Sequence, residues 1–465
     1  MTSNHEASDS KLLNEKSNGE SLEENNLESK IERSAYEKDD EAEQKEEIKE
    51  EGYRWLILVS FCMLSFASGM NWVTIASISG NVQEAYEYSS AFINLFSVSY
   101  AIMYLISFPL AVYLLDHKGL IRLGMTIAAL SAIVGVGLRL LFNTNIYLAL
   151  VGQFFCAFAQ PFTQISTGKV SSIWFRVQVR TIVCSIPSLF GIIGTMAGSV
   201  YYLMMVPSEV TNKEDYKDSV FTYLLSQAIL TFVLAAPTII FFKSKPQNSP
   251  SLSQQNLKTT KLSLKINITL LLSNKDFILF TLSYSLIIGY NNSLANIFVQ
   301  FFTKYNIPSE RCSLILLISC ITSIITSLSI SFLIDKTKNY KRVFQCCLLI
   351  GIFTQIVFVI VSELQIEAFL NNIFVVIVIP TVVITSTIGP FQAIGIDYVC
   401  ELTYPVGELI AGGTIMLGAQ IKSIGETYLF DFFLDTLDKR YYVHCENFLC
   451  QIITFVMLSF MSIII

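Results

Sequence analysis

A tryptophan and several small polar residues interrupt the first long apolar run of the sequence, residues 53–78. Ser65, Ser68, Asn71 and Trp72 all fall in the second half of that run. A helix that faced only lipid would have no reason to carry them, because polar groups without partners are costly in hydrocarbon. We therefore expect this face to line the protein interior or a water-filled cavity, where the indole of Trp72 could stack on a cationic ligand.

Side-chain amides inside three other apolar runs are further candidates for ligand contacts. Gln160 lies in the fourth run, Asn292 in the seventh and Gln420 in the eleventh. A buried amide needs a hydrogen-bonding partner, which a neighbouring helix or a substrate can supply. Two interpretations therefore stay open for each amide, namely a contact between helices and a contact to the polar end of a bound solute.

Ionisable residues are unevenly distributed over the apolar runs, and we find no acid at mid-depth in the first half of the chain. The second half contains Asp397, Glu401, Glu408, Glu426 and Asp431, together with Lys422. Asp397 and Glu401 are four residues apart and would share one face of a helix. They could form a proton or cation site, but the TYP sequence at 403–405 marks a turn and favours a charge network at a helix end.

Signatures of enzymes and metal sites are missing from the sequence. It contains no GxxxxGK[ST] loop and no HExxH motif, and the three histidines, His5, His117 and His444, fall in a tail or in loops. This placement argues against haem coordination inside the membrane and against a histidine proton relay. We predict no catalytic residue, cofactor or metal. Cys445 and Cys450 could form a disulfide if their loop faces an oxidising compartment.

The composition is that of a membrane protein. Of 465 residues 52% are hydrophobic and only 15% are charged, whereas about 25% would be charged in a soluble protein. Residues 1–52 hold 17 acidic and 7 basic residues, so this segment carries −10 and the rest of the chain +4. We expect a disordered acidic tail, with the first apolar run acting as the insertion signal. A nucleic-acid partner is not expected.

Twelve apolar runs are long enough to cross a bilayer, which needs about 20 helical residues. They fall near 53–78, 91–115, 120–142, 146–170, 181–205, 221–242, 277–302, 312–334, 343–361, 369–391, 408–433 and 448–465. A polar, basic linker at 243–275 separates six runs from six. The sequence thus predicts an all-α membrane protein whose twelve transmembrane helices form two bundles, 53–242 and 276–465.

The connections between runs predict an orientation. Lys and Arg gather in the second, fourth, sixth and eighth connections, whereas the first, fifth and ninth are acidic. By the positive-inside rule both termini are then cytosolic. The plasma membrane is the default location, and an internal membrane is the alternative. We expect a monomer that contacts the lipid bilayer and a small-molecule substrate.

The two halves repeat one loop. LLDHKGLIR at 114–122 follows the second run, and LIDKTKNYKR at 333–342 follows the corresponding run of the second half. Asp116 and Asp335 stand at a helix end and can cap or pair with nearby helix termini. The other residues expected to act in these loops are Gly119, Arg122, Lys338 and Lys341. The duplicated loop resembles the one that couples the rocking helices of the major facilitator superfamily.

Motifs over most of residues 53–430 resemble the FLVCR family, which is named for the feline leukaemia virus subgroup C receptor. They are GMNW at 69–72, GQFFCAFAQ at 152–160, SSIWF at 171–175, DKTKNYK at 335–341, GIDYVCELTYP at 395–405 and GAQI at 418–421. The resemblance implies a facilitator of choline or ethanolamine, for which haem export has also been proposed. It assigns Trp72 to the substrate-facing tryptophan, and Gln160 and Gln420 to glutamines of the fourth and eleventh helices.

The match departs from the family at two places. Asn292 stands where the family has an aromatic residue that closes the cage around the cation, and Tyr290 lies two residues earlier on another helix face. Gly191 and Ile192 stand where the family has an Asn-Gln pair. Trp72 alone would contribute roughly 0.5–2 kcal/mol to cation binding. The substrate is then expected to shift toward a primary amine or another small polar solute.

The sequence favours an alternating-access uniporter of a choline-like or ethanolamine-like cation, and not an enzyme. A transporter of haem or another amphiphile is one alternative. A transport-inactive receptor or scaffold is another, although a scaffold has no need of amides inside its helices. For Trp72 itself the alternative to a ligand contact is an anchor at the membrane interface, where tryptophan is common.

Overall fold

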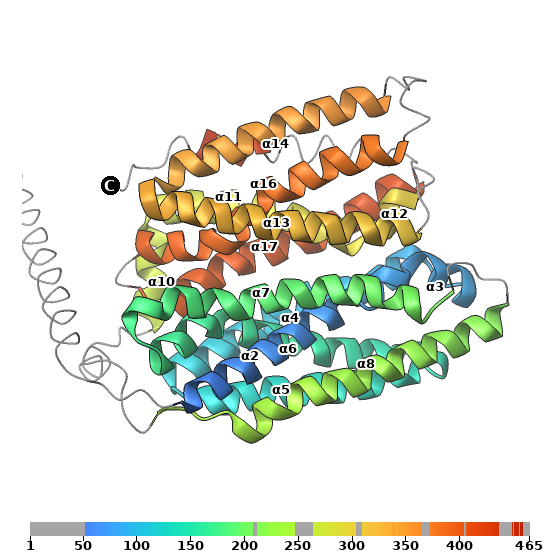
Figure 1. The fold of residues 1–465 in the computed structure, drawn as a ribbon, viewed down its shortest axis with the longest axis horizontal. Coiled ribbons are helices and arrows are strands. Elements are labelled where there is room, and N and C mark those ends of the chain that lie inside the picture. Colours follow the sequence, from blue (N-terminus) through green and yellow to red (C-terminus); the bar gives the residue numbers. More distant parts are fainter. Residues whose placement is uncertain are drawn as a thin grey trace, which may run out of the picture. The chain divides into compact units, whose positions relative to one another are not determined.

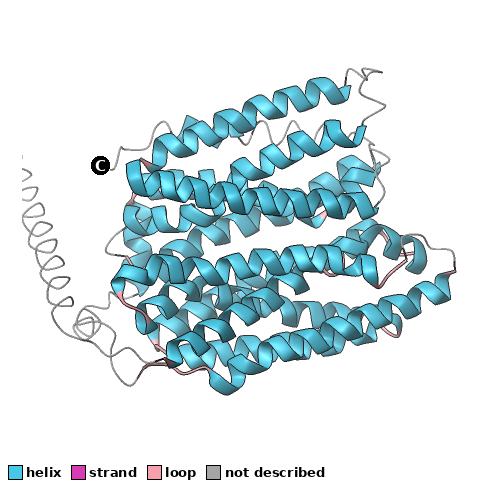
Figure 2. Ribbon diagram, viewed as in Figure 1, coloured by secondary structure: helices cyan, strands magenta, loops and turns pink. Residues whose placement is uncertain are grey.

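Helices form all the regular structure in the described part of the chain (Figures 1 and 2). The computed structural model describes residues 52–207, 212–246, 264–303, 309–337, 339–363, 373–403, 406–436, 449, 451–454 and 456–458. Apart from Lys245 and Pro246, these residues belong to one unit made of residues 52–244 and 262–465. The expected acidic tail at 1–51 lies outside the described residues, as do Cys445 and Cys450.

The first half contains six long helices and several short ones. In chain order they are α2 (Tyr53–Val73), η1 (Ala76–Ile78), α3 (Ser79–Tyr86), α4 (Ser90–Val112), η2 (Tyr113–His117), α5 (Ile121–Arg139), η3 (Leu140–Asn143), α6 (Ile146–Trp174), α7 (Val177–Tyr201), η4 (Tyr202–Met204) and α8 (Lys213–Phe241). Three long helices start where a polar side chain accepts a backbone N–H. Ser89 does so for α4, Asn145 for α6 and Asn212 for α8.

The second half is less regular. It contains α10 (Leu264–Ser273), α11 (Lys275–Asn296), α12 (Phe298–Thr303), α13 (Ser309–Thr337), α14 (Tyr340–Glu363), α16 (Ile373–Leu402), α17 (Glu408–Asp431) and η5 (Phe432–Thr436). The linker expected at 243–275 is helical in its last part, because the apolar sequence INITLLL lies within α10. The expected seventh span is broken at Ile297, whose backbone leaves the helical region with φ −110° and ψ 14°.

The lengths of the helices agree with a membrane protein. Within the described residues, nine helical segments are long and apolar enough to cross a bilayer, and a tenth if α10 and α11, bent by 83°, count as one. The α17 helix has 24 residues but is not among them, since its length includes Gln420, Lys422 and Glu426. Most of the expected twelfth span lies outside the described residues.

The two halves pack side by side, with the first half blue to green and the second half yellow to red in Figure 1. They meet chiefly through α4 against α17 and α7 against α13. Within the first half, glycines bring α2 and α7 together, and a Cβ added at Gly198 would lie 2.8 Å from the carbonyl oxygen of Met70. Below, the end of the bundle that bears α3 is called the α3 end, and the opposite end the α10 end.

Candidate functional site

The polar residues of the first span do not share one face. Gly69 lies against the backbone of α7, where a Cβ would collide with Gly191. Asn71 points toward α5 and α8 and bonds with side chains on both. Trp72 is half-buried and packs against an apolar cluster that α4, α5 and α6 supply, made of Tyr100, Val136, Cys156 and Ala157. Trp72 is therefore the member of the group that turns toward α4.

The register of α4 on α17 gives the depth of Gln420. The two helices run antiparallel: Asn94 bonds to Asp431 at one end, and a Cβ at Gly413 would collide with the Phe108 ring at the other. At a rise of about 1.5 Å per residue, Gln420 then lies about 10 Å from Gly413 and level with about residue 103. Met103 packs on the same cluster as Trp72. Trp72 and Gln420 thus lie at a similar depth, on opposite halves.

Three buried amides make no hydrogen bond to another described residue. They are Gln160, 8% exposed, Asn292, 8% exposed, and Gln420, 5% exposed. The Oε1 of Gln160 is enclosed and has no hydrogen-bond partner. By contrast, Gln153 donates to the carbonyl of Phe96 at 3.0 Å and Asn296 to the hydroxyl of Thr427 at 3.1 Å. The carbonyl oxygens of Gln153 and Asn296 lack a partner too, so these amides differ from the first three in that their NH2 groups connect helices.

Tyr290 and Asn292 lie in the same turn of α11 with different surroundings. The Tyr290 ring is 4% exposed and meets Phe430 of α17 edge to face, with centroids 5.9 Å apart. The ring therefore belongs to the seam between α11 and α17.

A fully buried arginine lies beside this region, and sequence reasoning missed it. Arg139, at the end of α5, is 1% exposed. Its Nη1 lies 3.4 Å from Asn71 Oδ1 and its Nη2 donates to Gln227 Oε1 at 3.1 Å. No carboxylate of the described residues pairs with it. The signal was present, since an arginine inside an expected span is a functional or structural site by default.

The Arg139 network extends over three helices. Asn71 also bonds with Thr231 at 3.2 Å, and Thr74 donates to Gln227 Oε1 at 2.8 Å. Gln227 in turn donates to the hydroxyl of Tyr223 at 2.9 Å. These contacts fix α2, α5 and α8 against one another, and so fix the direction in which Trp72 leaves α2.

The two halves touch at both ends. At the α3 end, Asn94 of α4 exchanges amide hydrogen bonds with Gln300 of α12, at 3.2 and 3.3 Å, and donates to Asp431 of α17 at 2.9 Å. We call Asn94, Gln300 and Asp431 the α3-end latch. At the α10 end, a Cβ at Gly168 of α6 would lie 2.8 Å from Glu408 Oε2 of α17. The two halves are therefore close to each other at both ends of the bundle.

The duplicated loop takes the expected position in the first half. Asp116 lies in the π-helical turn η2, and Gly119 has φ +64°, a left-handed conformation that glycine adopts without strain. Arg122 is exposed in the first turn of α5. The corresponding Asp335 lies in the last turns of α13 and Lys341 in the first turn of α14. Lys338 lies outside the described residues.

The acidic pair before the TYP turn stands near the end of α16. Asp397 is exposed, and Glu401 is the last residue but one of the helix, which ends at Leu402. Asp397 is close enough to Cys184 of α7 to influence it electrostatically. This position at a helix end agrees with the charge-network interpretation.

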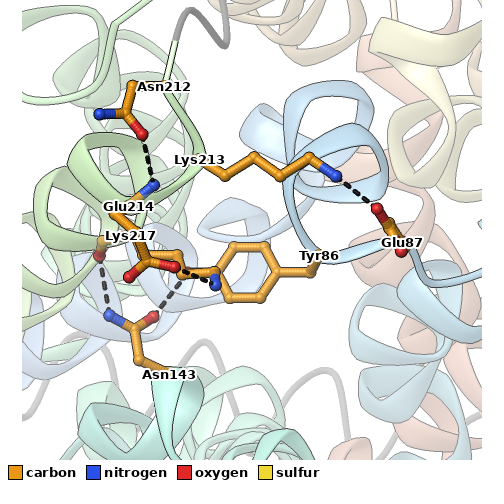
Figure 3. Close-up of polar contacts among 7 residues, drawn as sticks. All are labelled: Tyr86, Glu87, Asn143, Asn212, Lys213, Glu214 and Lys217. Atoms are coloured by element: carbon orange, nitrogen blue, oxygen red, sulfur yellow. Dashed lines mark hydrogen bonds and ion pairs between the residues drawn. The ribbon is translucent and has the colours of Figure 1, made fainter.

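Loops at the α3 end of the first half are joined by polar contacts (Figure 3). Tyr86 donates to Asn143 Oδ1 at 2.5 Å, and Asn143 donates to the carbonyl of Lys217 at 2.8 Å. Lys213 at the start of α8 pairs with Glu87 after α3. The loops that follow α3 and α5 are thereby tied to the start of α8.

The Glu87–Lys213 pair predicts a dependence of stability on pH. The hydrogen bond from Lys213 lowers the pKa of Glu87 below its ordinary 4.5. Because the pKa is lowered in the folded state, the contribution of the pair is present above about pH 4.5 and is lost as the pH falls through the lower value. Glu87→Gln is expected to lower the Tm slightly at pH 7 and not at pH 3. Glu84→Gln, an exposed control on α3, should show no such difference; equal pH curves for Glu87→Gln and wild type would contradict the assignment.

Comparison with known proteins identifies relatives. A choline/ethanolamine transporter of Danio rerio, flvcr2a, is 26% identical over 392 residues, which is 81% of this chain and 79% of that protein. Human FLVCR2, also a choline/ethanolamine transporter, is 25% identical over 395 residues, 81% of this chain and 71% of that protein. An uncharacterised MFS-type transporter of Caenorhabditis elegans is 25% identical, and the match covers 81% of this chain but only 64% of that protein. The resemblance that the motifs indicate is thereby confirmed.

Solved structures agree on the fold. The fucose:proton symporter of Escherichia coli superposes with a TM-score of 0.61 at 14% identity, over 88% of this chain and 98% of that one. A D-xylose–proton symporter gives 0.66 at 12% identity, over 87% and 97%. The sequence model described as Major Facilitator Superfamily matches residues 60–408, about three quarters of the chain. The chain therefore belongs to the major facilitator superfamily and is a membrane transporter homologous to the FLVCR choline/ethanolamine transporters.

Proposed function

We propose that this transporter carries a small organic cation of the choline or ethanolamine type by facilitated uniport. The observation that carries the proposal is a set of three buried amides, Gln160, Asn292 and Gln420, whose side chains make no hydrogen bond to another described residue. The resemblance assigns two of them, Gln160 and Gln420, to the substrate site. Buried amides are normally hydrogen-bonded, so an unbonded one indicates a missing partner. The hydroxyl of a small amino alcohol can supply it.

Trp72 supplies the contact to the cationic end. An indole face attracts a cation by about 0.5–2 kcal/mol, and a quaternary ammonium has no hydrogen to donate, so its recognition depends on such faces. Gln420 lies at a similar depth on the opposite half. A small amino alcohol between the halves would then have the indole for its cationic end and an amide for its hydroxyl. Asn292 is the residue of α11 proposed to face it, whereas the Tyr290 ring packs on Phe430 in the seam with α17.

Alternating access follows from the two sets of contacts between the halves. In the proposed orientation the termini and the α10 end are cytosolic, and the α3 end faces outward, at the plasma membrane by default. The loops of Asp116 and Asp335 couple the helices at the cytosolic side. Opening the α3-end latch admits the cation, and opening the Gly168–Glu408 contact releases it.

Uptake of labelled choline and ethanolamine into proteoliposomes tests the proposal. Trp72→Ala is expected to weaken apparent affinity by about 2- to 30-fold, the equivalent of the cation–π contribution. Trp55→Ala is the matched control, since Trp55 is 53% exposed near the α10 end and should leave uptake unchanged. Equal uptake by the Trp72 and Trp55 variants would remove Trp72 from the site.

Voltage provides a second readout of the same proposal. A monovalent cation gains about 2.3 kcal/mol per 100 mV, so an inside-negative potassium diffusion potential should accumulate it about 50-fold. If uptake does not depend on the membrane potential, the transported species is uncharged or zwitterionic.

A further inference from the structure

A lysine and a glutamate form an ion pair inside α17. Lys422 and Glu426 are four residues apart on one face, with Nζ 2.5 Å from Oε1. The side chains are only 17% and 4% exposed. Keeping two charges from water is costly, and replacing such a pair by apolar residues is often neutral or stabilising. Stability alone therefore does not account for the pair, and charges at this depth mark function by default.

The neighbouring helix α11 is shaped to receive the pair. A Cβ added at Gly289 would lie 2.9 Å from the Cβ and Cδ atoms of Lys422, so this glycine makes room for the lysine stem. One turn later, the hydroxyl of Ser293 donates to Glu426 Oε2 at 3.1 Å. Glu426 is thus held between an ammonium on its own helix and a hydroxyl on the next.

Other titratable groups on the elements packed against α17 are few at this depth. On α17 itself Asp431 lies beyond Glu426 and accepts from Asn94. The rest, helix by helix, are Glu408 and Tyr428 of α17; Lys275, Asp276, Tyr284 and Tyr290 of α11; Tyr100 and Tyr104 of α4; Asp397, Tyr398, Cys400 and Glu401 of α16; Tyr147, Cys156 and Lys169 of α6; Lys265 of α10; and Asp435 of η5. The charged residues of α11, α16, α6 and α10 lie toward the α10 end. Lys422 is therefore the cation that the geometry assigns to Glu426.

We propose that Lys422 is a built-in counter-cation, occupying the seat in which a proton or a monovalent metal ion would otherwise neutralise Glu426. The seat is made of a carboxylate and a hydroxyl, oxygen groups that suit either ion. With the ammonium permanently bound, transport needs no coupling ion. The inference rests on the proposed uniport for its meaning in transport, but the seat itself can be tested without any substrate.

The prediction concerns what happens when the ammonium is removed. Lys422→Met keeps the apolar stem and deletes the charge, which leaves a carboxylate in a place where an unpaired charge is very costly. The Glu426 carboxylate is then neutralised by a proton or a monovalent metal ion that it binds from solution. An ion that binds only the folded state stabilises it in proportion to its concentration relative to Kd.

Thermal unfolding of the purified full-length protein measures this directly. Lys422→Met is expected to gain several degrees in Tm when N-methyl-D-glucamine chloride is replaced by sodium chloride at pH 8, or when the pH is lowered to 5.5 without sodium. The sodium and acid arms distinguish the two ions. Three proteins serve as controls: wild type, Lys422→Arg and the double variant Lys422→Met/Glu426→Gln. In both arms, the changes in Tm of these proteins should agree within about 1 °C.

The other possible outcomes of the melting experiment either support or contradict the inference. Recovery of folded Lys422→Met only in sodium or at pH 5.5 would support it. A Lys422→Met protein whose Tm follows wild type in every buffer would overturn it, as would failure of that variant to fold in all buffers while the double variant folds. Absence of choline or ethanolamine uptake by the wild type would count against the proposed function and leave these melting results unaffected.

Discussion

Replacing Arg139 with alanine is expected to lower the free energy of unfolding by about 3–5 kcal/mol, the largest single effect we predict. The change opens a cavity in a site that is 1% exposed, and it removes donors from Asn71 and Gln227 on two other helices. Deleting the charge also removes its desolvation cost, which opposes the loss. Because the guanidinium holds three helices together, we expect the loss to dominate.

The same measurement includes variants that separate packing from charge. Arg139→Met fills most of the space without donors, and Arg139→Lys keeps the charge with shorter reach. Both should fall between wild type and Arg139→Ala in thermal or denaturant unfolding. Arg122→Ala, an exposed residue on the same helix, serves as the matched control and should change stability by less than about 0.5 kcal/mol. An Arg139→Met protein as stable as wild type would show that the network contributes packing alone.

Replacing Asn94 with alanine is expected to shift the protein toward a state open at the α3 end. The side chain makes two amide hydrogen bonds to Gln300 and one to the Asp431 carboxylate. Hydrogen bonds to a charged group contribute about 1.5–3 kcal/mol and neutral ones about 0.5–1.5 kcal/mol. Loss of about 2 kcal/mol from the closed state alone would raise the open population about 30-fold.

Thiol labelling at a residue behind the latch reports this opening. Ser77 lines a small pocket that both halves form near the α3 end, with Ala295, Phe298 and Ser313 on the second half. Ser77→Cys should react with a membrane-impermeant maleimide about 30-fold faster when Asn94 is also replaced by alanine. Ser99→Ala on the same helix is the control and should not change the rate, because the Ser99 hydroxyl donates to the carbonyl of Phe96 within α4. Equal labelling with and without Asn94 would remove the latch from the gating mechanism.

The helices could largely be predicted from the sequence because an apolar run of about 20 residues has few alternatives in a membrane protein. In the first half, the observed bounds of the helices differ from the expected bounds by several residues at more than half of the helix ends. The break at Ile297 could not be foreseen, since neither proline nor glycine marks it. The linker expected at 243–275 includes α10, whose apolar residues were read together with the polar residues before them.

The site was only partly accessible from the sequence. Gln160 and Gln420 were chosen for their motif context, and both are buried amides whose side chains make no hydrogen bond to another described residue. Asn71 and Trp72 are neighbours in the chain and were assigned to one face. The structure separates them, because successive helical residues point about 100° apart. Arg139 and the latch depend on which helices become neighbours, which apolar runs alone do not specify.

The interruption at Ile297 has a mechanical consequence. Gln300 belongs to the six-residue rod α12, while Ser293, which bonds to Glu426, belongs to the long helix before the interruption. A rotation of α12 about Ile297 would therefore release the Gln300 part of the α3-end latch while α11 stays in place, and the Asn94–Asp431 hydrogen bond between α4 and α17 would remain. Opening of the α3 end would then take two steps, a local movement of the short helix α12 and a separation of α4 from α17.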